Sequence, residues 1–106
     1  MAVTKDLDKR FNTRGGSIRI ETWIDVRTKA VTKYNLAYIN HRIFGGDNGR
    51  VVGFDNSHTY VGHGSAHHYH WFGRVLENTK FTTFDDTLVR FQRYLRRLKH
   101  HYGKDY

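Results

Sequence analysis

The chain has 106 residues, which is enough for one hydrophobic core and too few for two ordinary domains. It contains no Cys, so disulfides and thiolate metal sites are excluded, and no apolar run approaches the roughly 20 residues of a membrane-spanning helix. Eighteen Lys and Arg against ten Asp and Glu give a net charge of +8, which favours a polyanionic partner, nucleic acid before a membrane. We therefore expect a single cytoplasmic domain with no membrane partner, and the sequence allows a homo-oligomer.

The N-terminal part of the chain predicts a flexible lead-in followed by two strands. Residues 1–16 are polar and end in a Gly-Gly pair, so we expect them to be loosely ordered. Residues 18–27 alternate between apolar and polar side chains, which is typical of a half-buried strand. Residues 33–44 are rich in Tyr, Ile and Leu and predict a second strand. Its alternation slips, which indicates either a bulge near Asn40 or cover on both faces.

The middle of the chain predicts two more strands. Gly, Asp and Asn fill residues 45–49 and predict a hairpin turn, because these residues tolerate positive φ. Residues 50–55 then form a third strand. Residues 68–76 alternate again and predict a fourth, in which His68 and His70 share a face. The sheet is therefore expected within residues 17–77.

The last part of the chain changes to a helical period. Apolar residues recur at intervals of three and four and predict a helix over residues 83–102, with this apolar stripe: Phe84, Leu88, Phe91, Leu95, Leu98 and Tyr102. Thr83 and Asp86 are spaced as an N-terminal cap, and Gly103 is a typical stop. The expected fold class is α+β, an antiparallel sheet of about four strands with one long C-terminal helix packed on it.

Histidines are concentrated between Phe54 and Trp71, where five of the eight lie: His58, His63, His67, His68 and His70. Clustered imidazoles can bind a metal or exchange protons near neutral pH. The spacings match no strong metal template and the only local acid is Asp55, so we expect no metal and no cofactor. The alternative is a solvated surface that is merely rich in His.

RNA cleavage suits this set of side chains better than DNA cleavage does. RNA supplies its own nucleophile, the 2′-hydroxyl, so a protein needs only an acid, a base and cations for the developing phosphate charge. DNA lacks that nucleophile, and its cleavage usually needs metal ions. We assign acid and base, in either order, to His68 and His70. His58 is a further catalytic candidate from the neighbouring loop. Asp55 and Asn56 could orient an imidazole or fix the turn, and Arg50 and Arg74 could stabilise phosphate charge.

Two further features could contact nucleic acid. Arg93, Arg96 and Arg97 lie on the basic second half of the predicted helix and could grip phosphates, although a solvated outer face explains them equally well. Trp23 stands on the polar face of the first predicted strand and could stack a base or pack beneath a loop.

A family resemblance rests on the ordered run YNLAYINHRIFGGDNGRVVGFDNSHTYVGHGSAHHYHWFGRV followed by FTTFDDTLVRF. A Tyr-rich strand, a Gly-Asp-Asn-Gly turn, a strand ending in Phe-Asp-Asn, a His-rich stretch and a closing helix follow one another. Over roughly residues 19–98 the chain resembles the TumE-like toxin family of type II toxin–antitoxin modules. The resemblance implies a small toxin acting on RNA and held inactive by a cognate antitoxin with a helix-turn-helix domain. The matching positions are Asp55, Asn56, His58, His68 and His70, with Arg50 just upstream.

The leading hypothesis is therefore a toxin that acts as a metal-independent endoribonuclease. One alternative is a non-catalytic RNA- or ribosome-binding protein, which would use the same basic surface without a poised His. A second alternative is a metal-dependent nuclease that uses the His cluster.

Overall fold

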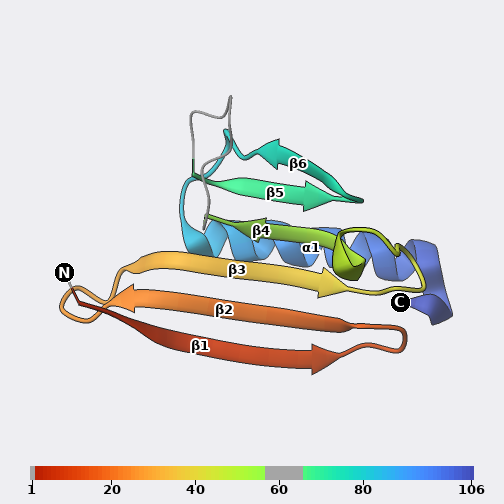
Figure 1. Cartoon of the computed structure of the whole chain (residues 1–106), viewed down its shortest axis with the longest axis horizontal. Helices are drawn as coiled ribbons and strands as arrows, with labels where there is room; N and C mark the ends of the chain where they lie inside the picture. Colours follow the sequence, from red (N-terminus) through yellow and green to blue (C-terminus); the bar gives the residue numbers. More distant parts are fainter. Residues whose placement is uncertain (1, 57–65) are drawn as a thin grey trace.

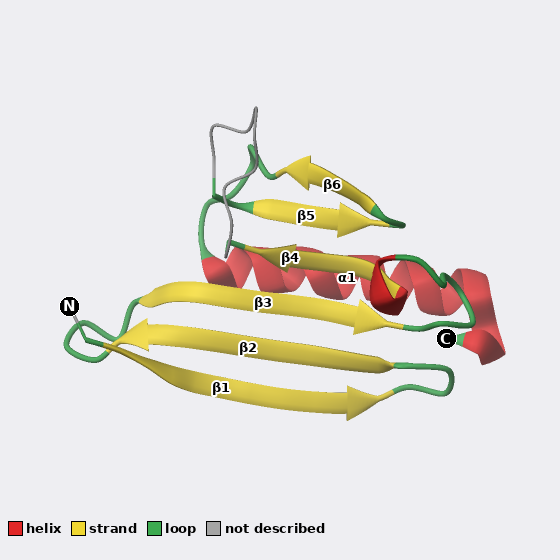
Figure 2. Cartoon of the chain, in the orientation of Figure 1, coloured by secondary structure: helices red, strands yellow, loops and turns green. Residues whose placement is uncertain are grey.

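One antiparallel sheet carries a single long helix on one face (Figures 1 and 2). The structure is a computed structural model and describes residues 2–56 and 66–106. Within these ranges the sheet has six strands in the order β1-β2-β3-β4-β5-β6, each antiparallel to its neighbours. The strands are β1 (Val3–Asn12), β2 (Ser17–Asp25), β3 (Val31–Ile39), β4 (Arg50–Asp55), β5 (His68–Trp71) and β6 (Arg74–Glu77). The helix α1 spans Phe84–Tyr102, and two 3-10 turns cover Asp47–Gly49 and Gly103–Asp105.

The expected α+β class, antiparallel sheet and C-terminal helix are confirmed, whereas the expected strand number of about four is wrong. The first additional strand is β1, in the segment expected to be a loose lead-in. It pairs with β2 only, and its side chains are almost all exposed, so it needs no apolar alternation to form. The Gly pair before β2 is a close-packing site, because a Cβ on Gly15 would lie 2.1 Å from the carbonyl oxygen of Asp105.

The second additional strand comes from residues 68–76, which form the β5–β6 hairpin and not one strand. The chain reverses at Phe72 and Gly73, where φ is 48° and 83°. Two successive positive φ values are typical of the type I′ hairpin turn. The reversal changes which side chains share a face, so that Tyr69 pairs with Leu76 and His70 with Val75.

The core lies between α1 and one face of the sheet. Thr83 caps the helix by accepting a hydrogen bond from the Asp86 amide at 3.1 Å, and Gly103 ends it, as expected from the sequence. The buried residues come from α1, β3 and β4: Phe91, Leu95, Leu98, Tyr34, Leu36, Tyr38, Val51, Val52 and Phe54. Figure 1 shows α1 along β3 and β4, with β1 and β2 extending beyond it. Within the described ranges, no helix covers part of the helix-side face or the opposite face.

The chain between β3 and β4 is organised by Asn40. The expected irregularity is present, because the pairing of β3 with β4 shifts between Tyr38 and Ile39. Asn40 is buried, and its backbone amide donates a hydrogen bond to the carbonyl of Gly49 at 2.8 Å. This bond closes the loop that carries Asp47 back onto the sheet. No helix in the described part of the chain is long and apolar enough to cross a membrane.

Candidate functional site

Strand alternation brings several of the predicted site residues together on the face opposite α1. In the β4–β5 pair, Asp55 lies opposite His68 and Gly53 lies opposite His70. Asp55, His68 and His70 therefore share one face, of which the sequence predicts the shared face of His68 and His70. All three are almost completely buried, with exposures of 4%, 0% and 2%.

His70 is held between two carboxylates. Its Nε2 lies 2.9 Å from Oδ2 of Asp55, and its Nδ1 lies 3.6 Å from Oδ2 of Asp47. Arg50 bridges the same two acids. It donates from Nε and Nη2 to the Asp47 carboxylate at 3.0 and 3.1 Å, and its Nη1 lies 4.0 Å from Asp55. We call these four residues, Asp47, Arg50, Asp55 and His70, the buried cluster, after Asp55 and His70, whose side chains are almost fully buried; the side chains of Asp47 and Arg50 are 26% and 24% exposed.

Local backbone features position the buried cluster. Asp47 and Asn48 both have positive φ, 49° and 54°, in the short turn before β4, which brings the Asp47 carboxylate back over the sheet. Gly53 provides room for Arg50, because a Cβ there would lie 2.9 Å from Arg50 Cδ. Sequence reasoning missed Asp47, which it treated only as part of a turn.

The geometry of the buried cluster is that of a supporting network. A substrate cannot contact His70 or His68 in this structure, because neither side chain reaches the surface. The Arg50 charge is already matched by two carboxylates, so it is not a free cation for RNA. Such a network stabilises a fold when all its members are satisfied. The catalytic roles expected for His68 and His70 stay predictions.

The remaining predicted site residues lie apart from the buried cluster. Asn56 continues the pairing of β4 with β3 beyond Asp55, since its Oδ1 accepts from the Tyr34 backbone amide and its Nδ2 donates to the Thr32 carbonyl, both at 3.0 Å. Arg74 is exposed on β6. His58 and His63 lie outside the described residues.

His67 forms a separate site on the helix side of the sheet. Its Nδ1 lies 2.8 Å from the Tyr34 hydroxyl, and its ring stacks on Phe81 with centroids 3.5 Å apart. Burial lowers the pKa of His67, and the charge of His68 adds to this effect. Burial also raises the pKa of Tyr34, with a contribution from Asp55. This pair lines a cavity of about 470 Å³ beside the start of α1.

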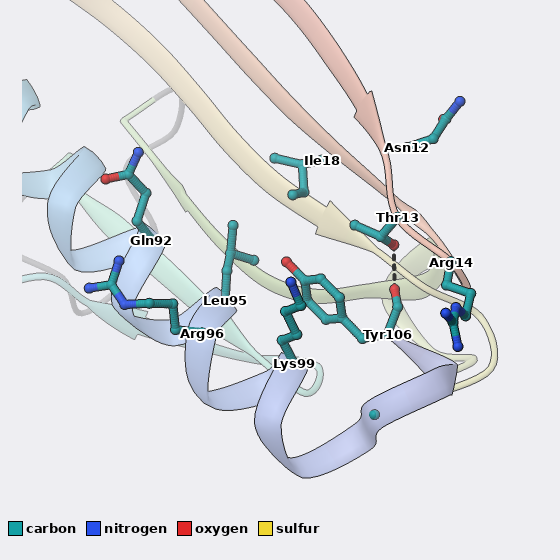
Figure 3. A pocket seen from close by; sticks show the side chains of 10 residues that line it. Asn12, Thr13, Arg14, Ile18, Gln92, Leu95, Arg96, Lys99 and Tyr106 are labelled. Atoms are coloured by element: carbon teal, nitrogen blue, oxygen red, sulfur yellow. Dashed lines mark hydrogen bonds between the residues drawn. The ribbon is translucent and has the colours of Figure 1, made fainter.

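A larger cavity of about 870 Å³ separates the β1–β2 hairpin from the second half of α1. We call it the basic groove. Figure 3 shows Arg96 and Lys99 on α1 and Arg14 on the hairpin turn around it. Among the described residues that line it there is no Asp or Glu. Its lining residues are Asn12, Thr13, Arg14, Ile18, Gln92, Leu95, Arg96, Lys99, Gly103 and Tyr106.

The three helix arginines expected to act together point in different directions. At 100° per residue, Arg96 and Arg97 diverge around the helix, and Arg93 lies between them on the outer ridge. Arg96 lines the basic groove, whereas Arg97 lines a pocket beside β5. All three are exposed.

Comparison with known protein families, curated proteins and solved structures gives no match. The resemblance to the TumE-like family therefore rests on the sequence motifs alone.

Two other candidate interactions can be placed. Trp23 lies on the face opposite α1, and its ring is flanked by the ammonium groups of Lys5 and Lys33, 5.1 and 4.6 Å from its centroid. The described ranges contain no group of three His, Asp or Glu side chains arranged to hold a metal ion. Of the sites described, the basic groove combines accessibility with unmatched charge.

Proposed function

We propose that this protein binds RNA and that the basic groove receives the phosphate backbone. The observation that supports this most is the lining of the groove, which has three cations and no Asp or Glu side chain among the described residues, around a cavity of about 870 Å³. Lys and Arg that neutralise phosphates release condensed counterions, and this release supplies most of the affinity of backbone binding. The net charge of +8 attracts the same partner from a distance.

Cations on the sheet face opposite α1 are partly neutralised by a carboxylate, unlike those of the groove. On the face opposite α1, Lys5 lies 2.7 Å from Glu21, and Arg19 lies 3.2 Å from the same carboxylate. In the described ranges, by contrast, Arg14, Arg96 and Lys99 form no ion pair. A cation without an ion pair binds phosphate without first losing a protein partner. Phosphate binding in the groove therefore costs less free energy than binding at Lys5 or Arg19.

Polar side chains in the groove favour RNA. Asn12, Thr13 and Gln92 place amide and hydroxyl groups among the cations. A ribose 2′-hydroxyl both donates and accepts hydrogen bonds, and it is the group by which proteins distinguish RNA from DNA. The groove can therefore offer phosphate contacts and sugar contacts together.

A ribonuclease toxin is the second candidate, and one observation favours it. The 2.9 Å contact between Asp55 and His70 fixes the orientation of an imidazole, as in acid–base sites where a carboxylate orients a His. With the family resemblance, this supports a toxin whose partner is a helix-turn-helix antitoxin. The burial of His70 counts against it. Incubation with a long RNA in EDTA distinguishes the candidates, since intact RNA rejects the metal-independent nuclease.

The test of RNA binding is a pair of charge-matched double variants. Arg96→Gln/Lys99→Gln removes two groove cations, and Arg27→Gln/Lys29→Gln removes two exposed cations from the turn between β2 and β3. Each phosphate contact to a single strand contributes about fivefold in affinity at 0.1 M salt, so the groove variant should bind roughly 20-fold more weakly. The turn variant should change affinity by less than about threefold. Equal losses in both variants would contradict binding in the groove.

A further inference from the structure

A third pocket lies on the flank of α1 that faces the β5–β6 hairpin. It has a volume of about 310 Å³ and is lined mainly by aromatic rings with two basic side chains at its edge. We call it the aromatic pocket, and its principal residues are Trp71, Phe72, Tyr94, Tyr102, Arg97 and His101. Its volume is at the lower end of small-molecule sites, which is suitable for one planar ring system.

The aromatic rings that line the pocket are inclined to one another. Trp71 lies 4.8 Å from Phe72 at 78°, and 5.3 Å from Tyr94 at 45°. None of these three side chains is fully buried. Each ring therefore keeps part of its surface accessible, and accessible aromatic faces stack on nucleobases of any sequence.

Phe72 occupies a backbone conformation that is unfavourable for a bulky side chain. Its φ of 48° is in the left-handed region, which a type I′ turn requires and which Asn, Asp and Gly adopt most easily. A bulky side chain in this region is strained. The Phe72 ring makes one contact that offsets this strain, since it packs on Phe44 with ring centroids 5.8 Å apart.

Positive charge connects the aromatic pocket with the basic groove. Arg96 and Lys99 border the groove, Arg97 and His101 border the pocket, and Arg93 lies on the ridge between them. After Asp86, α1 contains no acidic residue. A phosphate backbone could therefore cross the second half of α1 without meeting a carboxylate of the helix.

We propose that the aromatic pocket takes a nucleobase of single-stranded RNA. The strand lies with its backbone in the basic groove, crosses the exposed ridge of α1 and inserts one base among Trp71, Phe72 and Tyr94. This inference rests on the proposed RNA binding and names its substrate class, since a duplex keeps its bases stacked and paired. The pocket is tolerant of base identity because every base has a stacking face.

The experiment compares three probes: single-stranded oligoadenylate, a duplex RNA of the same length, and inorganic polyphosphate, which has the charge but no bases. Trp71→Leu should weaken oligoadenylate binding by about tenfold, the usual size of one lost stacking contact, and leave polyphosphate binding unchanged. Trp23→Leu, on the opposite face, is the matched control and should change neither. In a Trp23→Phe background, oligoadenylate should quench the fluorescence of Trp71, and polyphosphate should not.

Phe72→Asn provides a second variant in case Trp71→Leu unfolds. Asn suits the left-handed backbone of the turn, so the fold is retained while the ring is removed. It should weaken oligoadenylate binding and spare polyphosphate binding. The inference is overturned if Phe72→Asn and a folded Trp71→Leu bind oligoadenylate like the unaltered protein, or if polyphosphate quenches Trp71 equally. Failure of the proposed function is distinguishable from this result, because RNA binding outside the basic groove would leave the RNA affinity of Arg96→Gln/Lys99→Gln unaltered.

Discussion

Replacing His70 by Ala should lower the free energy of unfolding, because the His70 side chain is a buried member of the buried cluster. Its side chain is 2% exposed and contacts Asp55 at 2.9 Å. A hydrogen bond to a charged group contributes about 1.5–3 kcal/mol, and its loss leaves the buried Asp55 carboxylate with fewer partners. Asp55 keeps Arg50 at 4.0 Å after the substitution, and the space left by the ring adds a cavity cost, so we expect a loss of about 3 kcal/mol.

Urea denaturation followed by circular dichroism measures this loss. For a small domain with a slope of about 1.5 kcal/mol per molar urea, the midpoint should fall by about 2 M. His100→Ala is the matched control, because His100 is an exposed His on α1, and its midpoint should move by less than about 0.3 M. Equal midpoints for His70→Ala and the unaltered protein would refute the supporting role of the buried cluster. A folded His70→Ala that had lost a ribonuclease activity would favour the catalytic role instead.

Two further predictions concern the core and the charged face. Phe91 is fully buried against Phe54, so Phe91→Ala should lower the free energy of unfolding by about 3–5 kcal/mol in the same assay. The control Val89→Ala, at an exposed position of α1, should change it by less than about 0.5 kcal/mol. Similar losses in both variants would mean that α1 is not packed as described. Burial alone would raise the pKa of Glu21, but hydrogen bonds from Lys5 and Asn35 and the charge of Arg19 outweigh it, and the pKa lies below its ordinary value. Glu21 should therefore stabilise the fold above an ordinary pKa of 4.5, and this stability should be lost as the pH falls through its lower folded-state pKa. Unfolding at stepwise lower pH should show a shallower acid loss in Glu21→Gln, and identical acid profiles would count against the network.

Local patterns predict the elements whose side chains face a core. The three-and-four spacing from Phe84 to Tyr102 identifies α1 correctly, because one helical stripe must be apolar to pack on the sheet. The Thr83 cap and the Gly103 stop are confirmed for the same reason, since each satisfies backbone groups within one turn. Alternation also places His68 and His70 on one face, and the register of β4 with β5 adds Asp55 to it.

The two missed strands lack these local signals. β1 is an edge strand with exposed side chains on both faces, so its sequence resembles that of a polar lead-in. The turn at Phe72 and Gly73 carries a Phe where Asn, Asp or Gly would have indicated a hairpin. Pairing with β2 and β5 creates both strands, and pairing is a property of the folded sheet.

The candidate sites depend on contacts between distant segments. The basic groove joins the turn after β1 to the second half of α1, which lie some eighty residues apart. The buried cluster depends on Asp47, which approaches His70 only because the loop before β4 folds back on the sheet. The sequence identifies basic and His-rich segments, but it does not indicate which cations remain unpaired or which imidazoles are buried.

The salt dependence of RNA affinity tests binding in the basic groove most directly. Single-stranded RNA is titrated between about 50 and 200 mM salt into the unaltered protein, Arg96→Gln/Lys99→Gln and Arg27→Gln/Lys29→Gln. If Arg96 and Lys99 each neutralise a phosphate, the plot of log affinity against log salt should be shallower by about 1.4 in the groove variant. The turn variant should keep the slope of the unaltered protein. Parallel lines for all three proteins would contradict RNA binding in the groove.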